Sequence, residues 1–372
     1  MRQTIDNIYN RKLNLILDVG RAFNSVMEVD KLLTIIASRT SQLLNAERCS
    51  IYVVDYEKGL LWTKAAMGEG RIEIPIDSGI AGAVALSGEI INVPDAYSDK
   101  RFNRKIDRHT GYETKNLLSC PMKNSSGEII GVIQVLNRKG GAFDSEDEEV
   151  LKSLSGFAGN ALENALLYSE LKMTFHSVIE VLAATIDAKH HYTAGHTARV
   201  AEYSCGIARY LGLDDYEIEK IKVAAYLHDY GKIAIKDDIL TKPDKLTQEE
   251  FSQMKSHAAK TTEILSKMHF SKQYKDVPVI AGAHHEKYDG SGYPVGLRGG
   301  DIPFGARILA VADVFDALTS DRDYRKAMPS EKALEVMRSD DGKAFDPDVF
   351  AAFEKYFKEE LFVLEKDINF GG

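Results

Sequence analysis

The pattern of apolar and polar positions divides the chain into two halves of different character. Between residues 30 and 141, short strand-like segments alternate with turn signals, and helical periods flank them. These segments cover residues 49–54, 60–65, 71–74, 117–122 and 129–136. After residue 145 strand signals nearly vanish, and amphipathic or buried helices follow one another to residue 366. The pattern predicts an α+β domain followed by an all-α domain.

A long helix is predicted where the two halves meet. Ser145 and Glu148 form a predicted capping box at its start. Beyond it, side chains recur in steps of four and three, as in a coiled-coil seam. The seam consists of Val150, Leu154, Phe157, Ala161, Asn164, Tyr168, Leu171, Phe175, Val178 and Leu182. We predict a parallel homodimer through this helix, and the alternative is that the stripe packs on the chain's own two domains.

Composition narrows the class of protein. The 372 residues are 44% hydrophobic, which suits a folded chain of two or three domains. With 56 acidic and 47 basic residues the net charge is −9, so we expect no nucleic-acid polymer as partner. The aliphatic runs are too short to span a membrane, and the first ten residues do not resemble a secretory signal. The scattered Cys49, Cys120 and Cys205 suit a reducing compartment, so we expect a cytoplasmic protein without membrane association.

Histidine and aspartate gather in the helical half. Seven side chains able to bind metal lie in predicted helices or at their ends: His196, His228, Asp229, His257, His284, His285 and Asp313. Imidazoles and carboxylates without cysteine suit Fe, Mn, Zn or Ni. Seven ligands exceed the needs of one ion, whereas a shared Asp229 would bridge two ions ~3.5–4 Å apart, as in phosphoester hydrolysis. His109, His176 and His269 lack such a setting.

These residues carry a resemblance to a known family. His196, His228-Asp229 and Asp313 resemble the H…HD…D pattern of the HD superfamily of metal-dependent phosphohydrolases. Residues 228–232 (His-Asp-Tyr-Gly-Lys) and 284–294 (His-His-Glu-Lys-Tyr-Asp-Gly-Ser-Gly-Tyr-Pro) resemble the two signatures of its HD-GYP subfamily. The resemblance covers residues 178 to 360 and implies a cyclic di-GMP phosphodiesterase with an iron or manganese centre.

The resemblance also implies a role for each site residue. His196, His228, Asp229 and Asp313 would hold one ion, and Asp229, His257, His284 and His285 the second. Asp229 and Lys232 would take part in catalysis. The implied substrate contacts are Lys232, Tyr293, Asp316, Arg322 and Arg325.

One departure from the family's pattern bears on the number of metals and on the product. Tyr192 stands where relatives with three metals carry a glutamate, and His190 and His191 precede it. Tyrosine is a poor ligand for a third hard ion, so we expect two metals and linear pGpG, with GMP only if a second cleavage follows. The alternatives are hydrolysis of another cyclic dinucleotide, such as cyclic GMP-AMP, and a weakly active cyclic di-GMP receptor.

The amino-terminal half resembles a GAF domain of the cyclic-nucleotide phosphodiesterase type, a sensor built on an antiparallel sheet with flanking helices. Residues 134–138 and 143–148 resemble its N-K…F-x-x-x-D-E signature, with Arg138 in place of lysine. The resemblance implies a cyclic nucleotide, cAMP or cGMP, between segments 76–95 and 103–118. The alternative is an unliganded GAF domain that serves dimerisation only.

Four parts of the chain follow from these arguments. We expect an N-terminal helix at residues 1–23, a GAF sensor at 24–145, a dimerising linker helix at 146–180 and an HD-GYP domain at 181–372. The expected partners are cyclic di-GMP, a second copy of the chain, a cyclic-nucleotide effector and other signalling proteins.

Overall fold

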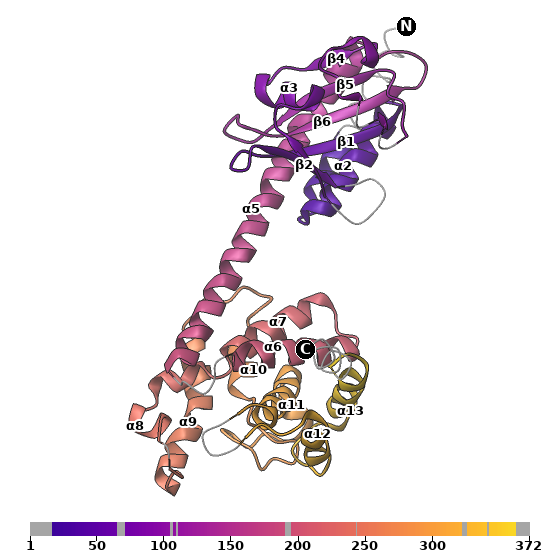
Figure 1. Cartoon of the computed structure of the whole chain (residues 1–372). Helices are drawn as coiled ribbons and strands as arrows, with labels where there is room; N and C mark the ends of the chain where they lie inside the picture. The colour runs from indigo at the N-terminus through magenta and orange to yellow at the C-terminus, as the bar shows by residue number, and fades with distance from the viewer. Residues whose placement is uncertain are drawn as a thin grey trace, which may run out of the picture. The chain divides into compact units, whose positions relative to one another are not determined.

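The computed structural model describes residues 17–64, 71–104, 107–108, 111–189, 195–242, 244–321, 326–340 and 342–361. The chain divides into two compact units, Met1–Met173 and Thr174–Gly372. In Figure 1 the first runs from indigo to magenta and the second from magenta to yellow. Residues 17–24 are helical, and the rest of the helix expected at residues 1–23 lies outside the described residues.

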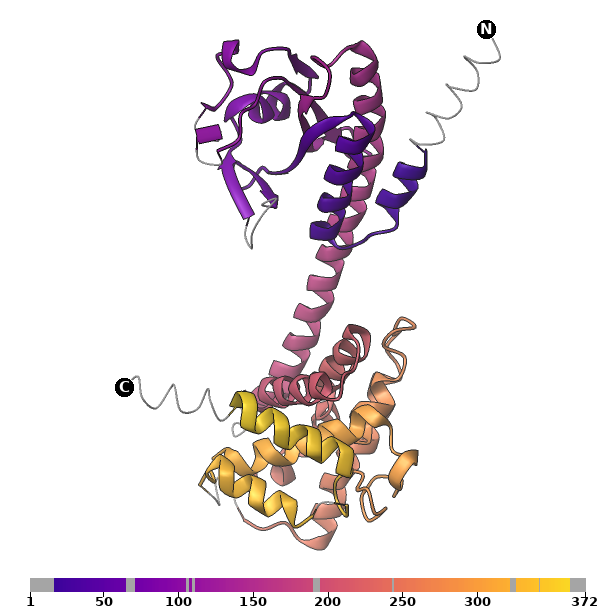
Figure 2. The same ribbon diagram turned by 90° about the vertical axis from the view of Figure 1, so that its right-hand side faces the viewer.

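A six-stranded antiparallel sheet with the order β3-β2-β1-β6-β5-β4 forms the centre of the first unit. Its strands are β1 Ala46–Asp55, β2 Leu60–Lys64, β3 Arg71–Pro75, β4 Ile91–Val93, β5 Leu117–Lys123 and β6 Ile129–Arg138. Helix α2 (Val29–Leu43) and the start of α5 (Ser145–Lys189) lie side by side on one face (Figure 2). Helix α3 (Gly79–Ser87) and the short η1 (Ala96–Ser98) contribute to the core on the other face. The predicted α+β domain is therefore confirmed.

Each face of this sheet has its own apolar core because side chains alternate along a strand. In β6, Ile133 and Val135 pack in the core that includes α2 and α5. Val132, one residue before Ile133, belongs to the opposite face and packs with Leu117 and with Ile80 of α3. The pattern missed only one of these strands: β4 has three residues, too few to establish a period of two.

The start of α5 differs from the prediction by one residue. Asp144, not Ser145, caps the helix, since its Oδ1 accepts the Asp147 N–H at 3.1 Å and its own N–H donates to Asp147 Oδ2 at 3.0 Å. Glu148 instead accepts a hydrogen bond from Asn92 Nδ2 at 2.8 Å. The capping box predicted at Ser145 and Glu148 is therefore wrong. An aspartate binds the free N–H groups of a helix start as well as a serine does.

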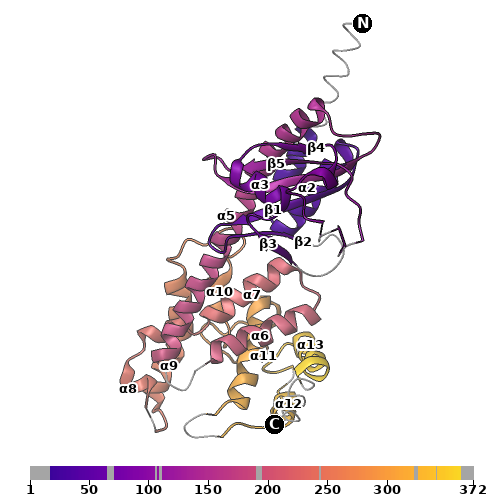
Figure 3. The ribbon, with the colours of Figure 1, turned by 45° about the horizontal axis from the view of Figure 1, so that its top comes forward.

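The second unit is all-helical, and its described residues contain no β-strand. Besides the end of α5 it consists of α6 His196–Tyr210, α7 Asp215–Leu227, η3 Tyr230–Ala234, α8 Asp237–Leu240, α9 Gln248–Leu265, α10 Val277–Gly282, η4 Gly299–Asp301, α11 Phe304–Thr319, α12 Ser330–Arg338, α13 Pro347–Tyr356 and η5 Phe357–Leu361. Helices α6, α7 and α11 lie together around its core (Figure 3). The predicted all-α domain is confirmed.

Small residues let the elements of the second unit approach closely. A Cβ at Gly231 of η3 would lie 2.0 Å from the carbonyl oxygen of His257 in α9. One at Gly282 of α10 would lie 1.8 Å from Thr262 Oγ1, also in α9. Any side chain at either glycine would push α9 away from its neighbours. The glycines thus hold together the elements that carry the candidate metal ligands.

The apolar stripe on α5 is used in two ways. Its first part packs within the first unit, where Leu154 is fully buried and Ala161 belongs to the core. Further along, Tyr168, Leu171 and Val178 remain 48%, 68% and 48% exposed. The alternative of packing on the chain itself therefore holds for the first part of the stripe, and also for Phe175 and Leu182, which pack against the core of the second unit. A dimer through the exposed Tyr168, Leu171 and Val178 stays a prediction. No helix in the described part of the chain combines the length and the apolar character that a membrane span requires.

Candidate metal centre

Five elements of the second unit bring the predicted ligands together. His196 is the first residue of α6, and His228 and Asp229 directly follow α7. A capping box of Thr247 and Glu250 starts α9, which carries His257. His284 and His285 follow the end of α10, and Asp313 lies within α11.

Asp229 stands at the centre of this group, and its two carboxylate oxygens face different imidazoles. Its Oδ1 lies 3.3 Å from His257 Nε2 and 4.0 Å from His284 Nε2. Its Oδ2 lies 3.4 Å from His228 Nε2 and 3.8 Å from His196 Nε2. A carboxylate placed in this way is able to bridge two ions.

Asp313 closes the group on the other side. Its Oδ1 lies 3.4 Å from His196 Nε2 and 4.0 Å from His228 Nε2, and its Oδ2 lies 4.0 Å from His285 Nδ1. Three sets of possible ligand atoms each fit within 4.8 Å: His257, His284 and His285; His196, His228 and Asp313; and His228, Asp229 and His284. All seven predicted ligands belong to at least one set.

The histidine tautomers are fixed by the backbone. The Nδ1–H groups of His228, His257 and His284 each donate to the carbonyl oxygen three residues earlier, over 2.6 to 2.7 Å. In the neutral form of these rings Nε2 carries the lone pair, and none of the three buried Nε2 atoms has a hydrogen-bond partner among the residues that the structure describes. Buried polar atoms without a partner are rare and costly in folded proteins. Lone pairs presented by histidines held in this way fit a metal ion well.

His196 is held by a side chain instead. Its Nδ1 lies 2.7 Å from Asp316 Oδ2, and Asp316 Oδ1 accepts the Arg199 Nε–H at 2.5 Å. Asp316 is only 1% exposed. We predicted Asp316 as a substrate contact, and this is wrong because its carboxylate is buried and occupied by His196 and Arg199. Arg199 escaped the sequence analysis, although an arginine one turn after a candidate ligand was a usable signal.

Burial and charge set the protonation of the centre. Burial lowers the pKa of His284 well below its ordinary value and that of His285 to about 4, so both rings are neutral and able to bind metal at pH 7. Burial opposes the charge of Asp229 as well, but Lys232 and His228 outweigh it and hold the pKa of this carboxyl well below its usual range. Burial also opposes the charge of His228, but Asp229 and Asp313 outweigh it and raise the pKa of this imidazole to about 9, so His228 has to lose a proton before it binds metal.

The predicted substrate contacts have different outcomes. Lys232 Nζ lies 2.5 Å from Asp229 Oδ2, at the edge of the ligand group. The half-exposed Tyr293 ring lies 4.7 Å from the His285 ring, centre to centre. Arg322 and Arg325 lie outside the described residues, as does Tyr192.

The loop that carries Tyr293 is held by a buried carboxylate. Glu286, 3% exposed, accepts the N–H groups of Val295 at 2.7 Å, Gly296 at 3.0 Å and Leu297 at 3.0 Å. A carboxylate bound by several backbone N–H groups is a strong local anchor. Glu286 belongs to the quoted signature, but its role was not foreseen because the sequence does not say which N–H groups it meets.

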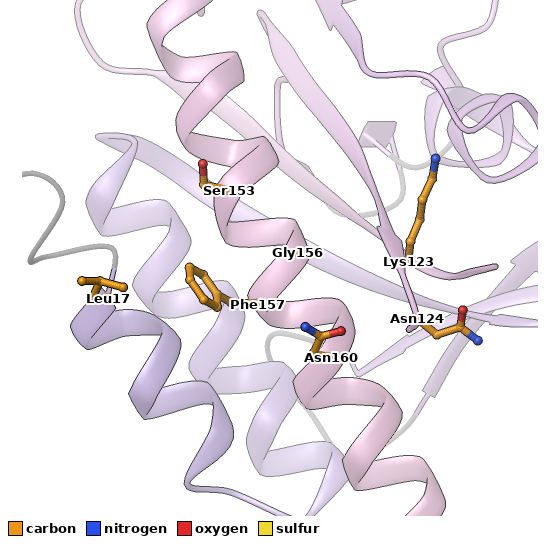
Figure 4. A pocket seen from close by; sticks show the side chains of 7 residues that line it. All are labelled: Leu17, Lys123, Asn124, Ser153, Gly156, Phe157 and Asn160. Carbon is orange, nitrogen blue, oxygen red and sulfur yellow. The ribbon is translucent and has the colours of Figure 1, made fainter. Parts of the chain in front are cut away.

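The first unit has a groove of a different kind. The groove has a volume of about 610 Å³. Figure 4 shows the residues that line it: Leu17, Lys123, Asn124, Ser153, Gly156, Phe157 and Asn160. These side chains include no histidine, cysteine or carboxylate, so this lining offers neither a metal site nor an acid–base pair. The groove is also separate from segments 76–95 and 103–118, where we predicted a cyclic nucleotide.

Comparison with known families gives two matches. A model of the GAF domain matches residues 28–162, and a model of the HD domain matches residues 180–349. Among similar proteins, the 3′3′-cGAMP-specific phosphodiesterase 3 of Vibrio cholerae serotype O1 is 38% identical over 60% of this chain and 51% of its own length.

Two further relatives are named as phosphodiesterases of cyclic di-GMP. The cyclic di-GMP phosphodiesterase response regulator RpfG of Xanthomonas campestris pv. campestris is 43% identical over 50% of each chain. A cyclic di-GMP phosphodiesterase of Thermotoga maritima is 41% identical over 54% of this chain and 55% of its own. The chain thus spans about half the length of these relatives. Together with the predicted motifs, the matches establish that the chain carries a GAF domain followed by an HD domain of the HD-GYP type.

Proposed function

We propose that the HD domain hydrolyses cyclic di-GMP to linear pGpG at a centre of two divalent ions, iron or manganese. The observation that carries this proposal is the Asp229 carboxylate, whose two oxygens face different imidazoles. Beside it lie three buried Nε2 atoms that have no hydrogen-bond partner within the described part of the chain. A shared carboxylate of this kind suits two ions about 3.5–4 Å apart, a spacing that serves the attacking and leaving oxygens of a phosphodiester.

The ligands divide into two sets around Asp229. The first set is His196, His228, Asp229 and Asp313, and the second is Asp229, His257, His284 and His285. Two bound ions supply Lewis acidity toward phosphoryl oxygens and make a water molecule acidic enough to react near neutral pH. The neutral state of His284 and His285 supports their role as ligands.

The remaining residues of the centre bind and position the substrate. The Lys232 ammonium, 2.5 Å from Asp229 Oδ2, has further N–H donors for a phosphate oxygen beside the ions. Asp316 positions His196, and Glu286 positions the loop that presents Tyr293 beside His285. We assign further phosphate contacts to Arg322 and Arg325, which lie outside the described residues.

The metal content tests the assignment of ligands without relying on activity. Plasma mass spectrometry of anaerobically purified protein should give about two ions per chain. The Asp229→Ala variant should retain less than about one, because it loses the ligand shared by both sets. Three ions per chain in the wild type would contradict the two-ion centre and favour GMP as the end product.

The second candidate substrate is 3′3′-cGAMP, favoured by the relative of that name that is 38% identical over 60% of this chain. Comparing kcat/KM for the two cyclic dinucleotides decides between them. We expect cyclic di-GMP to be preferred, and a preference for 3′3′-cGAMP would replace the substrate while keeping the reaction. Binding of either dinucleotide without turnover would favour a receptor.

For the GAF domain we propose a sensor of cAMP or cGMP. A polar row on the α3 side of the sheet supports a ligand there: Gln134 of β6 pairs in register with Ser50 and Ser119. The fully buried Ser119 Oγ has no hydrogen-bond partner among the described residues of this unit. Calorimetry with cAMP and with cGMP tests the proposal, and the absence of heat and of a thermal shift with both would contradict it.

We also propose that two copies of the chain form a parallel dimer through α5. Support comes from Tyr168, Leu171 and Val178, which lie in the predicted seam of this helix and are 48%, 68% and 48% exposed. Leaving such a stretch of apolar side chains in water is unfavourable, and a heptad-spaced helix covers them best with a second copy of itself.

A further inference from the structure

Beside the metal centre lies a lysine between two aromatic rings. Lys255 of α9 has its Nζ 4.8 Å from the ring centre of Phe251 and 5.2 Å from that of Tyr293. Both distances lie within the range of cation–π attraction, about 6 Å. We call Phe251, Lys255 and Tyr293 the α9 ledge.

The ledge adjoins the candidate ligands directly. The Tyr293 ring lies 4.7 Å from the His285 ring, and His285 lies 5.1 Å from His257, centre to centre. A molecule that reaches the ions with one phosphate therefore has the ledge at its side.

Lys255 differs in its pairing from Lys232 and Arg199, two other basic residues near the centre. Lys232 pairs with Asp229 at 2.5 Å and Arg199 pairs with Asp316 at 2.5 Å. Within the described part of the chain, no carboxylate oxygen lies within 4.0 Å of Lys255 Nζ. Its ammonium, held in place by two rings, is therefore available to an anion from outside.

Phe251 provides the second feature, a flat apolar surface. Its ring is 50% exposed although it lies next to the lysine. Purine bases stack readily on such rings, and a neighbouring cation adds to the attraction. Together the two side chains complement a nucleotide, because the Phe251 ring stacks on the base and the Lys255 ammonium binds the phosphate.

We propose that the α9 ledge binds the half of the cyclic dinucleotide that is not being cleaved. Lys255 binds the second phosphate, and a purine stacks on Phe251. The proposal rests on the proposed function, since it needs a substrate with two phosphates, one of them at the ions. It explains how a centre able to attack any phosphodiester selects a cyclic dinucleotide.

Kinetics with two substrates test the ledge. Cyclic di-GMP has a second phosphate and purines, whereas methyl 4-nitrophenyl phosphate has neither. In the full chain loaded with Mn(II), Lys255→Met and Phe251→Ala should each lower the ratio of kcat/KM for cyclic di-GMP to that for the small ester by about tenfold, mainly through KM. Lys255→Arg should restore much of the loss because it keeps the charge.

Matched controls exclude general effects of removing a surface side chain. Lys267→Met removes an exposed lysine that pairs with Glu263 at 3.2 Å, and Tyr216→Ala removes an aromatic ring that is 67% exposed on α7. Both controls should leave the ratio unchanged. An unchanged ratio in Lys255→Met, or equal losses on both substrates, would overturn the ledge alone. Turnover of the small ester but of no cyclic dinucleotide by the wild type would overturn the proposed function and the ledge with it.

Discussion

The Nδ1 atom of His196 lies 2.7 Å from Asp316 Oδ2, and this contact leaves His196 Nε2 facing Asp313 Oδ1 at 3.4 Å. A carboxylate that holds the second nitrogen of a metal-binding histidine fixes both its tautomer and its orientation. We therefore expect Asp316 to act on the centre by positioning His196.

From this contact we predict that Asp316→Asn weakens metal binding by about 10–100-fold, because the amide holds the imidazole less firmly. Calorimetric titration of the metal-free protein with Mn(II) measures this change in metal affinity. The control is Asp244→Asn, which alters an exposed aspartate. Unchanged Mn(II) affinity in Asp316→Asn would show that the contact does not position a ligand.

Glu286 makes a second prediction possible, about stability. In Glu286→Gln one of the two oxygens that accept N–H groups from residues 295–297 becomes an NH₂ group, which cannot accept them. A buried donor left without its partner costs about 1–3 kcal/mol, so unfolding of the metal-free HD domain in urea should require about that much less free energy. Glu335→Gln, on the exposed side of α12, should change nothing. A loss below about 0.5 kcal/mol would contradict the anchoring role of Glu286.

A third prediction concerns pH. The hydrogen bond from Lys242, followed by that from the Thr247 N–H, lowers the pKa of Glu250 below its ordinary value. A carboxyl whose pKa is lower in the folded chain stabilises the fold above the unfolded pKa, and this stabilisation disappears as the pH falls through the folded pKa. The melting temperature of the wild type should therefore exceed that of Glu250→Gln at pH 7, and the difference should shrink toward pH 3. A difference that stays constant with pH would show that the charge of Glu250 has no part in it.

The dimer proposal gives a fourth prediction. Leu171 is 68% exposed on α5, so Leu171→Lys should place charges in the interface and shift the protein from dimer to monomer. Light scattering at micromolar concentration measures the mass. Leu86→Lys alters a leucine on α3 that is 61% exposed and should leave the mass unchanged. A wild-type protein that is already monomeric would contradict the dimer.

The seven candidate ligands were open to prediction because histidines and aspartates in apolar helices need partners, whatever the details of packing. The geometry of these residues was not open to prediction, because the direction of an imidazole depends on contacts such as that between His228 Nδ1 and the backbone. Asp316 was misassigned for the same reason: the sequence places it one turn after Asp313 but does not say which nitrogen of His196 it meets.

The fold likewise has features that the sequence predicts and features that it does not. A long segment with clear periodicity such as β6 was predicted to within two residues, whereas the three-residue strand β4 was missed. The start of α5 was misplaced because Asp144 and Ser145 are both good capping residues. Choosing between them requires the backbone geometry.

Chromatography of reaction products tests the central claim most directly. The protein, purified without oxygen and loaded with Fe(II) or Mn(II), is incubated with cyclic di-GMP beside its Asp229→Ala variant. We predict that the wild type forms linear pGpG and that the variant leaves the substrate intact. Intact cyclic di-GMP with both metals, or equal product from the variant, would contradict a phosphodiesterase centred on Asp229.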